Sequence, residues 1–121
     1  MATVRYLVRD VDQSVAFYTK QLGFALRQQS GPNMAILGRD GLTLWLAGPG
    51  ASAARPMPDG RKPEPGGWNR FVLEVDDLAA LAATLKQQGV RFRNEVVSGP
   101  GGQQILCEDP SGNVIELFQP A

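Results

Sequence analysis

The stretch Val4–Leu26, VRYLVRDVDQSVAFYTKQLGFAL, decides the fold, because its pattern occurs a second time along the chain. The second copy is Arg70–Phe92, RFVLEVDDLAALAATLKQQGVRF. Each copy has an alternating apolar run, an acidic turn, a run with helical periodicity, a glycine and another alternating run. This order predicts strand, helix and strand in each copy. We therefore expect two related modules.

The two helical runs have residues at their ends that are typical of helix termini. Asp12 is expected to cap a first helix that ends at Leu22, with Gly23 in a left-handed position after its last turn. Asp77 and Gly89 are expected to bound the second helix in the same way. The faces predicted to pack inward are Val11, Val15, Tyr18 and Leu22 in the first helix, and Leu78, Leu81, Ala82 and Leu85 in the second.

Further alternating runs complete each module. GRDGLTLWLAG (Gly38–Gly48) corresponds in the second copy to EDPSGNVIELF (Glu108–Phe118). The strands are expected at residues 3–9, 24–30, 33–38, 42–47, 68–75, 90–98, 102–108 and 113–118. The predicted fold class is α+β, with two βαβββ modules in tandem that form a cupped, mixed β-sheet with helices on its outer face.

The chain divides into two modules and a connection. The first module covers residues 1–48 and the second 68–121, and a length of 121 residues suits one domain built from both. The connection, 49–67, is PGASAARPMPDGRKPEPGG, and its five prolines and four glycines prevent regular structure. It is expected to be a linker or a flap.

Composition excludes several classes of partner. The chain has 12 basic and 12 acidic residues, so no surplus of charge indicates nucleic-acid or membrane-surface binding. No apolar run approaches the roughly 18 residues of a membrane span, and MATVRYLVRD lacks the apolar core of a signal peptide. The single cysteine, Cys107, rules out an internal disulfide. We expect a soluble, cytoplasmic domain.

Strand alternation gathers an unusual set of side chains on the face away from the helices. Treated as one side of a single curved sheet, this face holds Arg5, Trp45, Trp68, Arg70, Glu116 and Phe118, with Thr3 at the start of the first strand. Aromatic walls with a few charged groups are typical of a small-molecule cavity. Core packing or solvent exposure is the alternative for each of these residues.

Other residues with reactive or charged side chains leave their roles open. Arg91 and Arg93 alternate on the predicted strand 90–98, where they either reach an anionic ligand or face solvent. Cys107 has no histidine to pair with, since the chain contains none, and is expected to be a buried strand thiol. Trp68 follows the glycine pair at 66–67 and either lines the mouth of the cavity or packs in the core.

The motifs RDVDQSVAFYTKQLGF (Arg9–Phe24) and EDPSGNVIEL (Glu108–Leu117) resemble the vicinal oxygen chelate superfamily. That superfamily includes glyoxalase I, extradiol dioxygenases and the bleomycin-resistance proteins. The resemblance covers nearly the whole chain and implies the two-module fold predicted above. It does not by itself assign a function, because this scaffold carries many activities.

The resemblance also implies where a divalent metal would be held in the metal-using members. The equivalent positions here are Thr3, Trp45, Arg70 and Glu116, and only Glu116 is a good metal ligand. We therefore expect no metal and no other cofactor. Our hypothesis is that Arg70 supplies the positive charge of the missing ion and pairs with Glu116. The alternatives are a salt bridge that only fills an inactive site, or two side chains that both reach solvent.

Three functions remain open. The favoured one is a metal-independent binding protein of the glyoxalase/bleomycin-resistance type, which holds an aromatic or amphipathic small molecule, such as an antibiotic or a metabolite. Trp45, Trp68 and Phe118 would be its walls, and Arg5 and Arg70 would orient polar groups of the ligand. The second is a metal-free lyase or isomerase in which Glu116 moves a proton. The third is a metal-dependent glyoxalase or dioxygenase. The resemblance further implies a homodimer.

Overall fold

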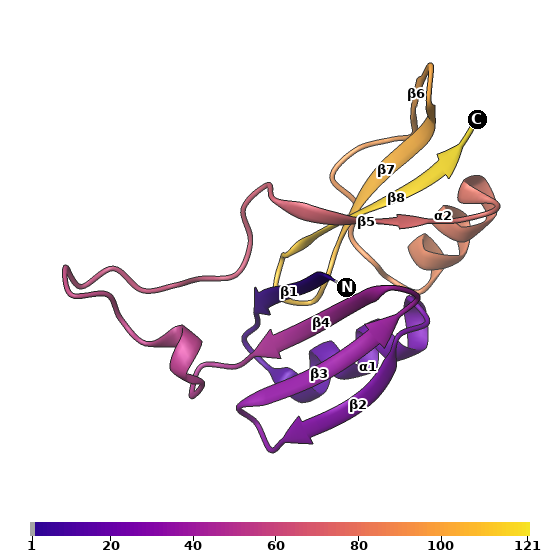
Figure 1. Ribbon diagram of the computed structural model, residues 1–121. Helices are drawn as coiled ribbons and strands as arrows, with labels where there is room; N and C mark the ends of the chain where they lie inside the picture. The colour runs from indigo at the N-terminus through magenta and orange to yellow at the C-terminus, as the bar shows by residue number, and fades with distance from the viewer. Residues whose placement is uncertain (1) are drawn as a thin grey trace. The chain divides into compact units, whose positions relative to one another are not determined.

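A computed structural model describes residues 2–121 (Figure 1). The elements are, in order, β1 (Ala2–Leu7), α1 (Val11–Gln21), β2 (Ala25–Ser30), β3 (Met34–Arg39), β4 (Leu42–Ala47), the 3₁₀ turn η1 (Ser52–Ala54), β5 (Arg70–Glu74), α2 (Leu78–Gln87), β6 (Val97–Gly99), β7 (Gly102–Glu108) and β8 (Val114–Pro120). The predicted α+β class with two βαβββ modules is confirmed. In this described part of the chain, no helix is long and apolar enough to cross a membrane.

The strands form two four-stranded mixed sheets, one in each module. Their strand orders are β1-β4-β3-β2 and β5-β8-β7-β6. In each sheet the first strand pairs in parallel with the fourth, and the other pairs are antiparallel. The prediction that the strand faces form one side of a single curved sheet differs from this arrangement. Within residues 2–121 each module instead completes its own ladder, because its first strand pairs with its own fourth strand.

The chain forms two compact units, which are described separately here. The first unit contains the chain up to Gly66 together with Pro110–Asn113, and the second contains Gly67–Asp109 and Val114–Ala121. The short loop Pro110–Asn113 therefore folds with the first unit, although it lies in the second sequence copy. Its Asn113 side chain donates to the Leu7 carbonyl oxygen at 2.7 Å and accepts from the Gly66 amide at 2.8 Å.

Helix α1 begins two residues earlier than its sequence predicts. The cap is Asp10, whose Oδ1 accepts a hydrogen bond from the Gln13 amide at 3.0 Å. The prediction of Asp12 as the cap is wrong, because Val11 already belongs to the helix and takes a buried position. Asp12 instead accepts a hydrogen bond from Gln29 Nε2 at 2.6 Å.

Helix α2 agrees with its prediction more closely. Asp77 caps it and accepts from the Ala80 amide at 3.0 Å. Leu78, Ala82 and Leu85 are buried as expected. Gly23 and Gly89, which follow the two helices, have φ values of +72° and +83°, the left-handed region that glycine occupies without strain.

The core of the first unit lies between α1 and its sheet. Tyr18 is fully buried, and its ring meets those of Phe17 and Phe24 edge-on at 5.1 and 5.4 Å. Ser14 is also buried, which its hydroxyl tolerates because it donates to the Asp10 carbonyl oxygen at 2.8 Å. Val15, predicted to face inward, is only half-buried, since the buried face is centred on Ser14, Phe17 and Tyr18.

The sixth strand is much shorter than predicted. Only Val97–Gly99 forms a strand, preceded by an isolated bridge between Phe92 and Cys107. The regular ladder breaks because the Asn94 side chain, through Oδ1, accepts the Leu106 amide at 2.9 Å, a hydrogen bond that a strand would make through its backbone. Arg91 and Arg93 therefore lie in a connecting segment and not on a strand.

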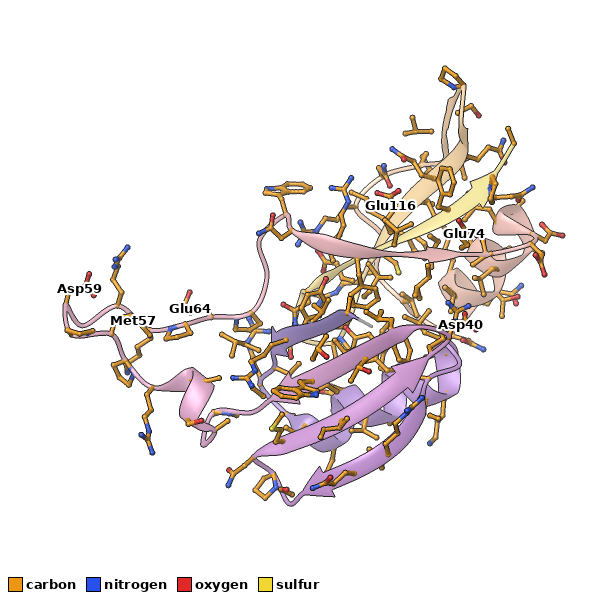
Figure 2. All side chains as sticks on the ribbon, in the orientation of Figure 1. Asp40, Met57, Asp59, Glu64, Glu74 and Glu116 are labelled. Atoms are coloured by element: carbon orange, nitrogen blue, oxygen red, sulfur yellow. The ribbon has the colours of Figure 1, made fainter. Side chains whose placement is uncertain are left out.

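The connection between the modules is irregular apart from η1. It runs out beyond the end of β4 (Figure 1), and Met57, Asp59 and Glu64 lie along it (Figure 2). Its inner part forms one wall of a hollow of about 350 Å³ in the first unit, between Pro56 and Lys62 on the connection and Leu7 and Ala47 on the strands.

Candidate ligand-binding faces

The first sheet has one face on α1 and a second face, called here the first distal face, that points away from it (Figure 1). In the strand register Arg5 lies opposite Trp45, and Trp45 lies opposite Ile36. The Arg5 guanidinium lies over the Trp45 indole, 4.9 Å from the ring centroid. Thr3 is one step along the same face, opposite Thr43. The sequence therefore placed Arg5 and Trp45 correctly on one face.

A further arginine joins the first distal face and was missed by the sequence analysis. The register between β2 and β3 shifts between Leu26 and Gln28, which leaves Arg27 as the extra residue of a bulge. Its guanidinium lies over Gly38, where an added Cβ would collide with it. Gly38 pairs with Thr43, so Arg27 rests on the distal face. Strict alternation cannot foresee this, because a bulge changes which face a side chain takes.

The second sheet has a corresponding face away from α2, the second distal face. Arg70 Nε donates to Glu116 Oε1 at 3.0 Å, so the predicted ion pair is present. Glu116 is buried, with 8% of its surface exposed, and lies between Val72 on β5 and Leu106 on β7. Figure 2 shows Glu116 on β8. The carboxylate within this apolar strand is thus neutralised by a guanidinium of its own sheet.

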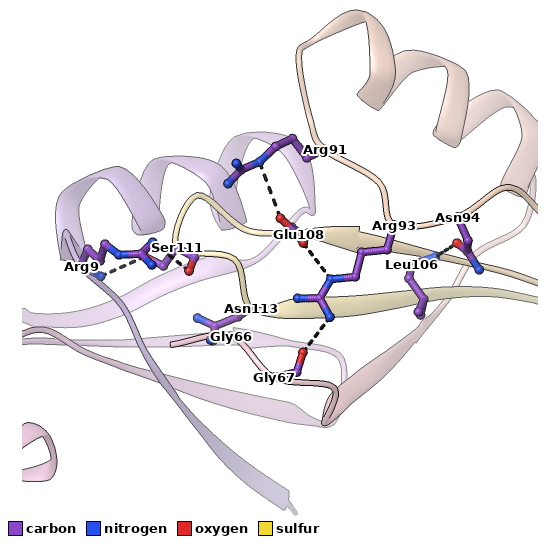
Figure 3. A network of polar contacts seen from close by, with 10 residues as sticks. All are labelled: Arg9, Gly66, Gly67, Arg91, Arg93, Asn94, Leu106, Glu108, Ser111 and Asn113. Carbon is purple, nitrogen blue, oxygen red and sulfur yellow. Dashed lines mark hydrogen bonds and ion pairs between the residues drawn. The ribbon is translucent and has the colours of Figure 1, made fainter. Parts of the chain in front are cut away.

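Arg91, Arg93 and Glu108 form a polar network (Figure 3), and Trp68, which comes just before β5, stacks on Arg93. The Arg93 guanidinium lies 4.5 Å from the Trp68 ring centroid and donates to the Gly67 carbonyl oxygen at 2.7 Å. Its Nε also donates to Glu108 Oε2 at 2.7 Å, and Arg91 contacts the other oxygen of Glu108 at 3.6 Å. Trp68 is 67% exposed. It is therefore a stacked surface residue before β5 and not a core residue.

Phe118 lies at the other end of the second distal face. It pairs with Gln104 on β7 and lines a hollow of about 290 Å³ formed with the β6–β7 hairpin. The hollow includes Val97, whose side chain is largely exposed. Phe118 thus presents a phenyl ring to a small apolar recess in the second unit.

Comparison with known proteins assigns the family. Residues 1–117 match the Glyoxalase/Bleomycin resistance protein/Dioxygenase superfamily. The chain belongs to this superfamily. A search of curated proteins gives no significant sequence match.

Solved structures of the glyoxalase/bleomycin-resistance superfamily are similar over nearly the whole chain. TnmS3, an antibiotic binding protein from Streptomyces sp. CB03234, is 29% identical with a TM-score of 0.73, covering 98% of this chain and 93% of its own. A superfamily member from Sphaerobacter thermophilus is 27% identical with a TM-score of 0.77, covering 98% and 95%. Lactoylglutathione lyase from Agrobacterium tumefaciens is 18% identical with a TM-score of 0.75, covering 98% and 92%, and supports the fold alone.

The residues at the superfamily's metal positions do not fit a divalent ion. The first unit supplies Thr3 and Trp45 there, and an indole has no lone pair to donate to a metal. The second supplies Arg70 and Glu116, and the Arg70 guanidinium, which repels a cation, already contacts one oxygen of the carboxylate. Across residues 2–121, no three His, Cys, Asp or Glu side chains lie close enough to hold an ion.

Cys107 is fully buried on β7, facing α2 and not the distal face. Burial raises the pKa of its thiol from 9.0 to about 12; a backbone hydrogen bond opposes part of this rise, and the nearby acids Asp109 and Glu108 contribute to it. A thiol with this pKa stays protonated at neutral pH and is a poor nucleophile. This agrees with the expectation of a buried strand thiol.

Proposed function

We propose that this superfamily member binds an aromatic or amphipathic small molecule on its distal sheet faces and needs no metal ion to do so. The observation that carries the proposal is the pairing of each distal face: Arg5 with Trp45, and Arg70 with Glu116. The family resemblance implies that Trp45, Arg70 and Glu116 are at positions where metal-using members hold their ion, and Arg5 is the strand neighbour of Trp45. They provide a flat aromatic surface and ordered guanidinium groups, which are common in ligand sites.

The similarity to TnmS3 supports a binding function. That protein is described as antibiotic binding, and it shares 29% identity with this chain over nearly its full length. Trp45, Trp68 and Phe118 are the aromatic side chains we propose as walls. Arg5 and Arg70, with Thr3, are the polar groups we propose to orient the ligand.

A metal-free lyase or isomerase is the second candidate, because Glu116 is a buried acid on the second distal face. In that reaction Glu116 would transfer a proton to or from the substrate. The ion pair counts against it, since Glu116 must leave Arg70 before it can accept a proton freely. Binding without turnover is therefore the function we prefer.

Intrinsic fluorescence tests the proposal, because Trp45 and Trp68 are the only tryptophans. Trp45→Phe and Trp68→Phe give two proteins that each report from one sheet. Titration with a set of planar aromatic compounds should quench fluorescence to saturation, with no loss of the compound over hours. Absence of saturable quenching in both proteins would contradict the proposal, and steady conversion of a compound would favour the enzyme.

We also propose that the protein is a homodimer, as its family resemblance implies. Several large apolar side chains are exposed on a single chain, among them Leu26, Val72, Val96 and Val97. Burying them against a second copy would remove apolar surface from water. Sedimentation equilibrium should give twice the mass of the chain, and a monomer at micromolar concentration would contradict this.

A further inference from the structure

The charges on the two distal faces are balanced differently. In the second unit each arginine has an acidic partner: Arg70 pairs with Glu116, and Arg91 and Arg93 both pair with Glu108. On the first distal face Arg5 and Arg27 have none. Within residues 2–121, the Arg5 guanidinium contacts the Trp45 ring and Arg27 rests on Gly38, and neither has a hydrogen-bond or ion-pair partner in the protein.

The strand positions around Arg5 and Arg27 carry no acid, and Asp40, in the turn after β3, contacts Arg39 at 3.9 Å. The strand positions that share the first distal face are Thr3, Leu7, Gln28, Ser30, Met34, Ile36, Thr43, Trp45 and Ala47, and none carries a negative charge. Two cations beside threonine hydroxyls and an indole therefore form a positive, partly apolar surface in a protein with no net charge. Such a surface favours a ligand that has a ring and an anionic group.

Both guanidiniums are held in place before any ligand arrives. The Arg5 guanidinium packs on the Trp45 ring. Because Gly38 has no side chain, the Arg27 guanidinium packs directly on the buried backbone of β3. A glycine inside a strand commonly marks such a close approach. Gly38 and Trp45 are diagonal neighbours on adjacent strands, a separation of roughly 7–8 Å between Cα atoms. A guanidinium that is already ordered loses less entropy on binding an anion.

We infer that the ligand carries an anionic group, a carboxylate or a similar oxyanion, bound by Arg27 and Arg5 on the first distal face, with its apolar part over Trp45 and Ile36. The inference rests on the proposed binding function and narrows it to acidic aromatic compounds. It also gives Gly38 and the bulge at Arg27 a role in specificity, since together they bring Arg27 onto this face.

A matched pair of probes tests the inference: 2-naphthoate, which is an anion, and 2-naphthamide, which has the same ring and no charge. Calorimetric titration of the unaltered chain measures both affinities, so no residue proposed to line the site is changed in the parent protein. We expect naphthoate to bind about tenfold more tightly than naphthamide, the usual weight of one hydrogen bond to a charged group. Raising the salt concentration should weaken naphthoate binding alone.

Three variants locate the effect. Arg27→Gln removes the cation, and Gly38→Ala displaces it while keeping the net charge. Each should weaken naphthoate binding about five- to tenfold and naphthamide binding less than about twofold. Arg61→Gln is the control, because Arg61 lies on the connection, 84% of its side chain is exposed, and its loss changes the net charge equally.

The outcomes distinguish failure of this inference from failure of the proposed small-molecule binding function. Equal affinity for the two probes, or an equal loss in Arg61→Gln and Arg27→Gln, would overturn the inference and leave the binding function standing. If Gly38→Ala weakened both probes alike, the added methyl group would act by bulk and the role of Arg27 would be refuted. Failure of both probes to bind would contradict the proposed function and the inference together.

Discussion

Glu116 lies in an apolar strand, and its charge is balanced by Arg70, which is two residues from Val72, the residue opposite Glu116 on β5. Strand alternation predicted that both side chains share a face, since a period of two is fixed by the backbone. Their contact depends in addition on the parallel register of β5 and β8, which no local pattern states. The sequence therefore predicted that Arg70 and Glu116 share a face, whereas their contact depends on the register of β5 and β8.

The ion pair should be visible in stability. Arg70→Gln leaves a buried carboxylate without its guanidinium and should lower the free energy of unfolding by about 1–2 kcal/mol. Glu116→Gln should cost less, because the amide oxygen still accepts from Arg70. Urea unfolding measures both. Arg39→Gln is the control: its contact with Asp40 is long at 3.9 Å and partly exposed, so about 0.5 kcal/mol or less is expected. Equal losses in Arg70→Gln and Arg39→Gln would contradict the role given to burial.

The raised pKa of Cys107 predicts that the stability of the protein decreases as the pH rises above 9. Its native pKa of about 12 exceeds the ordinary 9.0, so the unfolded chain loses this proton first as the pH rises. The contribution of the protonated Cys107 thiol to the free energy of unfolding is fully present below pH 9 and is lost between pH 9 and 12. Stability of the parent should therefore fall more steeply over this range than that of Cys107→Ala, which has no thiol. Identical slopes, or rapid labelling of the native thiol at pH 8, would refute the assignment.

At the scale of elements, local patterns predicted which segments form helices and strands but not all of their ends. Capping and periodicity placed α2 well, because Asp77 is the only acid directly before its first apolar residue. Asp10 directly precedes Val11, whereas Asp12 is followed by Gln13, and the choice between the two acids depends on the burial of Val11. The sixth strand was overestimated because the Asn94 side chain takes over a backbone hydrogen bond. Arg27 reached its face through a bulge, which has no reliable local signal.

The cap assignment of α1 can be checked by substitution. Asp10→Ala removes the acceptor of the Gln13 amide and should lower the free energy of unfolding by about 1 kcal/mol. Asp12→Ala removes a contact with an exposed side chain and should cost clearly less, about 0.5 kcal/mol or below. Thermal and urea unfolding give both values. The reverse order would restore Asp12 as the cap.

At the scale of the whole molecule, two copies of one module have kept their architecture and changed their chemistry. Trp45 and Glu116 occupy equivalent places on the fourth strand of each sheet, and in both units a guanidinium from the first strand lies against that residue. At these positions the first unit has an arginine stacked on a tryptophan, and the second has an arginine paired with a glutamate. The sequence predicted the duplication. It did not predict that Pro110–Asn113 packs with the first unit, because this packing depends on contacts between residues far apart in the sequence.

That loop should contribute strongly to stability. Asn113→Ala removes the side chain that joins the Leu7 carbonyl group to the Gly66 amide and leaves both without this partner. We expect a loss of about 2 kcal/mol in the free energy of unfolding. Asn69→Ala, at an exposed position outside the strands, is the control and should stay within about 0.5 kcal/mol of the parent. A small effect in Asn113→Ala would show that the loop is not needed to complete the first unit.

The central claim is that arginine and aromatic side chains bind the ligand without a metal ion. The most direct test is a calorimetric titration of the chelator-stripped protein with 2-naphthoate, repeated after stoichiometric Zn²⁺ or Ni²⁺ is added. We predict saturable binding in the stripped protein and a Kd that the ions leave unchanged. Binding that appears only after an ion is added would contradict the account.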